Sequence, residues 1–241
     1  TERRIFKLFH SVKRLSMLKN QDIKKIINKT LNIDTNDDKE TINESLVANV
    51  KQFNMNTEYL SDANKSNHLQ LYKNYVESFN KISAELDGAD KSDSNSNNSA
   101  FRSLKIDETY NMNAIYLHEL YFANVNDPNS KITMDSLAYM RLARDFGSFD
   151  DWQKDFIACC KASRCGWVVT YYNFYTQTFM NTLIDLHSEN VPVGFYPVIV
   201  MDVWQHAYYK DYLKDVKTYV VAMMKQFNWN IINKRFEKAD K

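Results

Sequence analysis

The sequence predicts an α+β fold, in which an N-terminal helical hairpin is followed by an α/β domain with a three-stranded antiparallel sheet. Two long stretches of helical periodicity lie on either side of a polar segment, residues 87–100, which predicts two helices joined by a loop. Three later runs of β-branched and aromatic residues predict the strands. Only 4 Gly and 3 Pro occur in 241 residues, so long, uninterrupted helices are expected.

Composition narrows the classes of protein to which the chain can belong. With 31 Lys and Arg against 30 Asp and Glu, the formal net charge is +1, which excludes a strongly basic nucleic-acid binder and predicts no nucleic-acid contact. No run approaches the roughly 20 apolar residues that a membrane-spanning helix needs. Cys159, Cys160 and Cys165 are odd in number and clustered, so they cannot form a disulfide framework and favour a reducing compartment.

Residues 1–50 are predicted to be a basic N-terminal extension. Within residues 1–19, Lys and Arg far outnumber the single acid, Glu2, and apolar residues recur every three or four positions, which indicates an amphipathic basic helix. Such a segment is typical of an organelle-targeting sequence, a docking arm or an ordinary surface helix. From this segment we expect a mitochondrial location, on the matrix side. Residues 20–45 predict an irregular connection with one short helix.

Residues 51–126 are predicted to form the helical hairpin domain. Apolar side chains follow one helical stripe over residues 69–86 and another over residues 107–123. The stretch between them, residues 87–100, is rich in Asn, Ser and Asp and contains no large apolar side chain. We therefore expect a solvated insertion at the turn of an antiparallel hairpin.

Residues 127–241 are predicted to form a C-terminal α+β domain that binds a metal. Ser148 is expected to be the N-cap of a helix, with Asp150 and Asp151 in the first turn. The three strands are expected to pair as an antiparallel meander. In chain order, the expected elements are helices over 134–143 and 148–163, strands over 166–174, 178–186 and 195–203, and helices over 210–227 and from 229 onward.

The metal site is suggested by a carboxylate and an imidazole at the end of the last predicted strand. Asp202 ends that strand and His206 follows four residues later, although this spacing alone more often reflects a surface ion pair. His118 lies on the apolar stripe of its helix, and His68 shares a helical face with Tyr75. Taken singly, each histidine is expected to be a core or cap residue. Together the set offers three nitrogens and one oxygen, which suits iron or manganese and leaves room for solvent or substrate.

Several segments resemble the iron/manganese superoxide dismutase family. The strongest likeness is DVWQHAYYKDY (202–212), where the family has Asp-x-Trp-Glu-His-Ala-Tyr-Tyr. It continues in RDFGSFDDWQKDF (144–156), CGWVV (165–169) and FNWNIINKRFE (227–237), and more weakly in LHELYF (117–122) and HLQLYKNYVESFN (68–80). The resemblance covers the chain from about residue 51 to its C-terminus and leaves the N-terminal extension outside.

The resemblance implies an iron/manganese superoxide dismutase-like fold, one metal ion per chain and a redox activity. Superoxide would be converted to oxygen and hydrogen peroxide in two half-reactions, while the protein tunes the metal and supplies protons. The implied ligands of the iron or manganese ion are His68, His118, Asp202 and His206.

The resemblance also implies roles for residues around the metal. By position, Tyr75 matches the family's gateway tyrosine. His187 falls near a position where many members carry Gln and some carry His, and a ring nitrogen there would hydrogen-bond the metal-bound solvent. These two are the implied catalytic residues. The residues implied behind the ligands are Trp167, Trp204, Gln205 and Tyr209.

Four positions depart from the family pattern. Many members place the first ligand eight residues before the gateway tyrosine, where this chain has Asn67. We expect His68 to be the ligand instead, because an offset of seven keeps it on the tyrosine's helical face. Gln205 replaces a glutamate that reaches the partner subunit's ligand histidine in family dimers, and Leu71 stands near a histidine that bridges to the partner. Asp215 aligns with an arginine at the mouth of the substrate funnel.

These observations leave three functions open. The first is an active superoxide dismutase, with superoxide as its substrate, and the sequence leaves open whether the chain forms a homodimer or joins a larger protein complex. The second is a structural subunit of a larger mitochondrial assembly, such as a ribosome or respiratory complex, with reduced or no activity. The basic extension, the insertion and the changed dimer contacts favour it. The third is a mononuclear iron oxygenase, which is disfavoured because three histidines are available and no cosubstrate-binding motif is visible.

Overall fold

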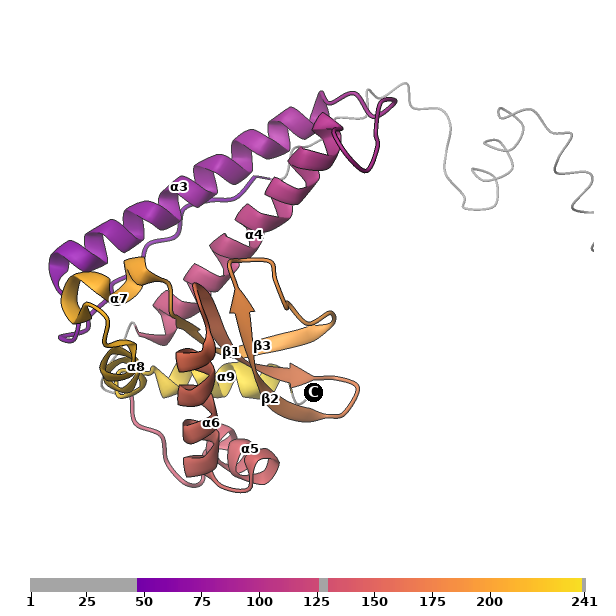
Figure 1. Ribbon diagram of the computed structural model, residues 1–241. Helices are drawn as coiled ribbons and strands as arrows, with labels where there is room; N and C mark the ends of the chain where they lie inside the picture. Colours follow the sequence, from indigo (N-terminus) through magenta and orange to yellow (C-terminus); the bar gives the residue numbers. More distant parts are fainter. Residues whose placement is uncertain (1–46, 126–129, 240–241) are drawn as a thin grey trace, which may run out of the picture. The chain divides into compact units, whose positions relative to one another are not determined.

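The computed structural model describes residues 47–125 and 130–239 (Figure 1). The basic helix expected within residues 1–19, and the irregular connection over 20–45, lie outside the described residues. The described residues belong to one compact unit, which runs from Ser45 to Lys241.

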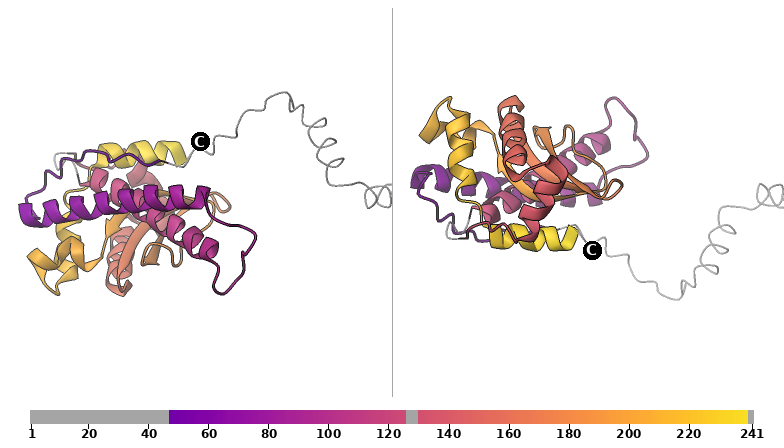
Figure 2. Two further views of the ribbon diagram at one scale, coloured as in Figure 1. Left: turned by 90° about the horizontal axis from the view of Figure 1, so that it is seen from above. Right: turned by 90° about the horizontal axis from the view of Figure 1, so that it is seen from below.

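Two long helices form the hairpin that the sequence predicts. They are α3 (Asp62–Asp87) and α4 (Ala100–Asn124), and both begin well before the starts expected from their apolar stripes. The reason is capping, because the hydroxyls of Ser61 and Ser99 each accept a hydrogen bond from a backbone N–H three residues later. The connection between the helices projects away from the sheet (Figures 1 and 2).

An irregular segment that precedes the hairpin is fastened to it by side chains. The Asn80 amide accepts from the backbone N–H of Ala48 at 2.7 Å and donates to its carbonyl at 2.9 Å. The buried Tyr72 hydroxyl accepts from the backbone N–H of Lys51 and donates to Glu119. Because Glu119 also forms an ion pair with Lys51, the segment is tied to both helices of the hairpin.

The sheet has the three predicted strands, but its order differs from the expected meander. The strands are β1 (Gly166–Asn173), β2 (Thr178–Asp185) and β3 (Phe195–Asp202), all antiparallel, in the order β2-β1-β3. The meander was wrong because β1, not β2, is the central strand. All of its residues except the last are buried, whereas β2 has exposed and half-buried positions. Central strands are covered on both faces and therefore read as nearly continuous apolar runs.

Among the described elements, four helices pack against this sheet: α4 against β3, together with α5 (Leu137–Phe146), α6 (Phe149–Ala162) and α9 (Trp229–Ala239). Ser148 is the N-cap of α6, as predicted, and its hydroxyl accepts the backbone N–H three residues later. The two acidic residues expected in the first turn are present there, where they interact favourably with the helix dipole.

The segment expected to be one helix over residues 210–227 is two helices. These are α7 (Gln205–Tyr212) and α8 (Val216–Met224). Between them Leu213 has a φ of 51°, which a continuing right-handed helix cannot contain. Asp215 then starts α8, because its carboxylate accepts the backbone N–H of Thr218. The break lets α7 begin directly after β3, close to the start of α3 (Figure 1).

A buried guanidinium joins the C-terminal helix to the rest of the core. Arg235 on α9 donates to the side-chain oxygen of Asn124, to the carbonyl of Val198 and to the carbonyl of Leu120. Burial lowers the pKa of Arg235 to about 10. These bonds connect α9 with the end of α4 and with β3, the two elements that carry site residues. Among the described residues, no helix is both long enough and apolar enough to cross a membrane.

Candidate metal centre

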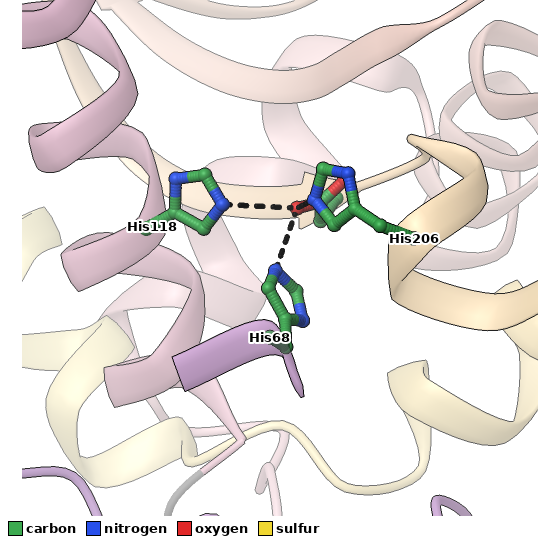
Figure 3. A group of neighbouring side chains, drawn as sticks. His68, His118 and His206 are labelled. Carbon is green, nitrogen blue, oxygen red and sulfur yellow. Dashed lines mark hydrogen bonds and ion pairs between the residues drawn. The ribbon is translucent and has the colours of Figure 1, made fainter. Parts of the chain in front are cut away.

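Three histidines and one aspartate from four different elements meet in the interior (Figure 3). His68 comes from α3 and His118 from α4, Asp202 is the last residue of β3, and His206 lies in the first turn of α7. One potential ligand atom from each residue lies within 4.8 Å of those of the others. The fold therefore brings together residues that are up to 138 positions apart in the chain (68 to 206).

The three imidazoles face one oxygen of the Asp202 carboxylate. The Nε2 atoms of His68, His206 and His118 lie 3.1, 3.3 and 3.8 Å from Oδ2, as the dashed lines of Figure 3 show. His68, His118 and Asp202 are fully buried, whereas the side chain of His206 is 25% exposed. Among these four residues, His206 alone has a side chain that is partly accessible to solvent in the described part of the chain.

Hydrogen bonding fixes the tautomer of His118. Its Nδ1 lies 2.7 Å from the carbonyl oxygen of Ala114, one helical turn earlier, and a carbonyl can only accept, so Nδ1 carries the proton. The Nε2 atom therefore presents a lone pair toward Asp202. That atom is buried without a hydrogen-bond partner among the described residues. Burial also lowers the pKa of His118 well below its usual value, chiefly by desolvation, so the ring is neutral at pH 7.

The aspartate is held so that one oxygen is free for the histidines. The backbone N–H of Trp204 donates to Oδ1 at 2.8 Å, and the Tyr219 hydroxyl donates to the Asp202 carbonyl at 2.8 Å. Tyr121 in turn bonds the Tyr219 hydroxyl at 3.0 Å. Burial alone raises the pKa of Asp202, but the interactions with His206 and His68 outweigh it and hold the pKa far below the usual range. The carboxylate is therefore ionised.

These properties fit a transition-metal site. Imidazole nitrogens and an ionised carboxylate are donors that iron and manganese accept. The unpartnered Nε2 of His118 is a buried polar atom that an ion would satisfy. Nδ1 of His68 is a second buried ring nitrogen without a hydrogen-bond partner among the described residues.

A fourth imidazole lies beside the group with both ring nitrogens bonded. The indole N–H of Trp167 lies 3.0 Å from Nδ1 of His187, and since an indole can only donate, that nitrogen is unprotonated. The proton of the neutral ring is therefore on Nε2, which donates to the Tyr75 hydroxyl at 3.0 Å. Burial lowers the pKa of His187 to about 4 and raises the pKa of Tyr75 to about 12.

Four aromatic rings enclose His187. Trp204 stacks on it with ring centroids 5.1 Å apart, and Tyr75 and Tyr110 meet it edge-on at 5.0 and 4.7 Å. Trp167 completes the enclosure through its indole bond. Both tryptophans also border the four-residue group, since Trp167 packs edge-on to His118 and Trp204 stacks on His206.

The structure chooses between the two candidates for the first ligand position. Asn67 is exposed, whereas His68 is 1% exposed and faces Asp202. Gln205 and Tyr209, expected behind the ligands, are exposed on α7, and neither side chain forms a hydrogen bond with another described residue. Within one chain, these two residues are therefore not brought to the site.

The other two departures also lie at the surface. Leu71 is half-buried on α3, four residues before Tyr75. Asp215 is exposed, and its carboxylate caps α8 by accepting from the backbone and hydroxyl of Thr218. Asp215 therefore does not supply the arginine's positive charge, and its carboxylate instead caps the start of α8.

Some contributors were not predicted from the sequence. Tyr121 and Tyr219 hold the Asp202 backbone, Tyr110 encloses His187, and Asn113 donates to the His187 carbonyl at 2.9 Å. The tyrosines occupy apolar positions of helical patterns, where they are indistinguishable from core residues. Asn113 gives no periodic signal at all, because its partner lies 74 residues further along the chain.

Comparison with known proteins finds relatives over most of the chain. A family model described as the C-terminal domain of iron/manganese superoxide dismutases matches residues 135–235. The iron superoxide dismutases of Aquifex pyrophilus and Aquifex aeolicus are each 34% identical over 190 residues, which cover 77% of this chain and 88% of the relative. A manganese superoxide dismutase of Halobacterium salinarum is 33% identical over 133 residues, covering 55% of this chain and 66% of the relative. Relatives named for iron and for manganese both match.

Proposed function

Because this chain belongs to the iron/manganese superoxide dismutase family, we propose that it disproportionates superoxide at the group formed by His68, His118, Asp202 and His206. The observation that carries the proposal is this set of three imidazoles and one carboxylate around a common point, three of the four residues being buried. Burying polar groups whose lone pairs converge is costly unless they bind an ion or are hydrogen-bonded.

The proposed ligands would be Nε2 of each histidine and one carboxylate oxygen of Asp202. Iron or manganese held there would supply one-electron redox chemistry, by which two superoxide ions and two protons yield one dioxygen and one hydrogen peroxide. The partly exposed side of His206 would admit the anion, and the burial of the other three ligands would keep bulk water away from them.

The proposed task of His187 and Tyr75 is to hold protons beside the metal. Peroxide formation consumes two protons, and both residues carry one at pH 7, since the pKa of Tyr75 is raised to about 12 and the neutral His187 ring is protonated on Nε2. Because Nε2 donates to the Tyr75 oxygen, the phenolic hydrogen is left free to donate toward the site. The indole of Trp167 keeps this arrangement in one orientation.

Metal analysis combined with a superoxide-consumption assay tests the proposal. We expect the purified full chain to contain iron or manganese and to consume superoxide. We also expect His206→Ala to lose both, whereas Gln70→Ala, exposed on α3 and bonded only to Asn74, keeps both. Absence of iron and manganese from the purified protein, or activity unchanged in His206→Ala, would refute it.

A second candidate function is favoured by the surface of α7 and its surroundings. Tyr209 and Leu213 are 47% and 63% exposed, and Gln205 stands where family dimers use a glutamate. Together with the departures at Leu71 and Asp215, the replacement at Gln205 suits a subunit of a larger mitochondrial assembly, with reduced or no activity, located in the matrix. Size-exclusion chromatography of native extract distinguishes the two: a free homodimer at about twice the 28.4 kDa chain mass would contradict stable incorporation.

A further inference from the structure

His187 lies on a turn whose backbone is conformationally costly. The turn follows β2, and within it Leu186 and Asn190 have φ angles of 56° and 65°. Non-glycine residues in this left-handed region cost on the order of 1 kcal/mol each. The turn therefore keeps this shape only because surrounding groups hold it.

Two backbone bonds hold the turn without involving the His187 backbone. The backbone N–H of Leu186 donates to the Cys165 carbonyl at 2.7 Å, and that of Glu189 donates to the Asp185 carbonyl at 3.1 Å and closes the turn around His187. His187 itself is held by α4, since the Asn113 amide donates to its carbonyl oxygen at 2.9 Å. Among the described residues, no other hydrogen bond reaches the His187 backbone.

Helix α4 therefore fixes the positions of both His187 and the candidate ligand His118. Asn113 binds the turn, Tyr110 packs against the His187 ring one turn earlier, and His118 enters the metal group five residues later. The rings of His118 and His187 lie 6.0 Å apart. Because α4 is a rigid element between these contacts, the Asn113 bond fixes the distance between the metal group and the histidine that bonds Tyr75.

We propose that Asn113 is a positioning residue for the dismutation reaction: its amide holds the turn so that His187 reaches Trp167 and Tyr75 together. This inference rests on the proposed function. Without the donor, the His187 carbonyl loses its partner and the turn relaxes toward less costly backbone angles. Nε2 of His187 then moves away from the Tyr75 hydroxyl, and proton delivery slows. The approach of superoxide is unaffected, because Asn113 is not among the residues that face the metal group.

Two size-matched variants remove the donor in different ways. Asn113→Leu removes it without adding charge, and Asn113→Asp removes it while keeping the side-chain shape. The matched control is Asn111→Asp on the same helix, where the amide donates to the Asp107 carbonyl at 2.7 Å within α4 and does not touch the turn. All variants are prepared as metal-loaded full chains.

The first readout is hydrogen–deuterium exchange by mass spectrometry, which does not depend on activity. In both Asn113 variants we expect the peptide covering residues 186–190 to exchange about fivefold faster, as the loss of a neutral hydrogen bond predicts. The second readout is the kinetics of superoxide consumption. We expect kcat to fall about fivefold while kcat/KM and metal content are unchanged, because proton supply and not encounter is impaired. Asn111→Asp should change neither readout.

The outcomes separate this inference from the proposed function. If the wild-type chain does not consume superoxide, the proposed function fails, and the exchange readout still tests whether Asn113 holds the turn. Unchanged exchange at 186–190 in both variants overturns the inference. It is also overturned if exchange rises equally across the chain, or if kcat and kcat/KM fall together, since either result indicates a general loss of stability. Faster exchange with unchanged kcat overturns the link to the reaction.

Discussion

Acid is expected to destabilise the fold through His187, and the size of the effect follows from its surroundings. The ring is wholly buried, and desolvation lowers its pKa from 6.5 to about 4. Below pH 6.5 His187 binds a proton in the unfolded chain but stays unprotonated in the folded chain, so the free energy of unfolding falls as the pH falls. The loss begins near pH 6.5 and is nearly complete at pH 4. A difference of about 2.5 pKa units at about 1.4 kcal/mol each gives a full loss of about 3.5 kcal/mol, of which about 3 kcal/mol is reached at pH 4.

The variant that isolates this contribution is His187→Gln. Glutamine does not titrate, and its amide can still accept from the Trp167 indole and donate to the Tyr75 hydroxyl. Urea unfolding followed by tryptophan fluorescence at pH 7, 6, 5 and 4 gives the free energy of unfolding of both proteins. We expect the wild-type protein to lose about 3 kcal/mol more than the variant across this range.

Comparing the two proteins removes the other titrating groups. Burial also lowers the pKa of His68 and of His118, and their contributions are present in both chains and cancel in the difference. Metal content is measured at each pH so that unequal release is recognised. If the two proteins lose equal stability between pH 7 and pH 4, the burial of His187 does not oppose its charging and the reasoning is refuted.

Three further outcomes are expected. Chelation of the metal should lower the midpoint of thermal unfolding measured by calorimetry, and iron or manganese should restore it, because an ion at about 1,000 times its Kd stabilises by about 4 kcal/mol. An unchanged midpoint would contradict a bound structural ion. Tyr75→Phe should lower kcat by about tenfold or more in a superoxide assay with metal content unchanged, since it removes the hydroxyl that His187 bonds. Arg235→Met should lower the free energy of unfolding by about 3 kcal/mol in urea, because it leaves Asn124 and the Val198 carbonyl without their buried donor; a loss below about 1 kcal/mol would contradict this.

Local patterns of residue types in the sequence were sufficient to predict much of the fold. The β-branched runs predicted all three strands within a residue of their observed ends, and Ser148 predicted the start of α6. Pairing order was not predictable in the same way. The meander assumed that neighbours in sequence are neighbours in the sheet, whereas β3 pairs with β1. Which strand is central depends on burial of both faces, a property of the whole domain.

Helix ends depended on single residues that periodicity does not reveal. The polar first turn of α3 is capped by Ser61. The stripe of apolar residues begins later in the helix and therefore does not reveal where α3 starts. The break between α7 and α8 depends on Leu213 at positive φ and on Asp215 as a cap. Neither residue is a strong helix breaker by composition, so only the tertiary packing that pulls α7 toward α3 explains the interruption.

The candidate site was predictable because its chemistry is concentrated in a few residue types. Only five histidines occur in the chain, and three of them join Asp202. The contacts that hold them were not predictable, because carbonyl acceptors such as that of Ala114 and amide donors such as Asn113 have no sequence signature. Helical spacing favoured His68 over Asn67, because an offset of seven keeps His68 on the face of Tyr75. The burial of each side chain agrees with this choice, since His68 is buried and Asn67 is exposed.

The partners of Asp202 distinguish a metal site from a set of ordinary core histidines. A buried carboxylate in a structural ion pair normally has a Lys or Arg beside it, yet among the described residues the side-chain partners of Asp202 are the three imidazoles. Burial lowers the pKa of His68 and of His118, so at neutral pH these rings do not carry the positive charge that would balance the carboxylate. The charge is balanced when a cation binds the lone pairs that converge on it. Packing alone would not leave an ionised carboxylate beside two buried neutral imidazoles, and this imbalance favours a metal-binding role for the group.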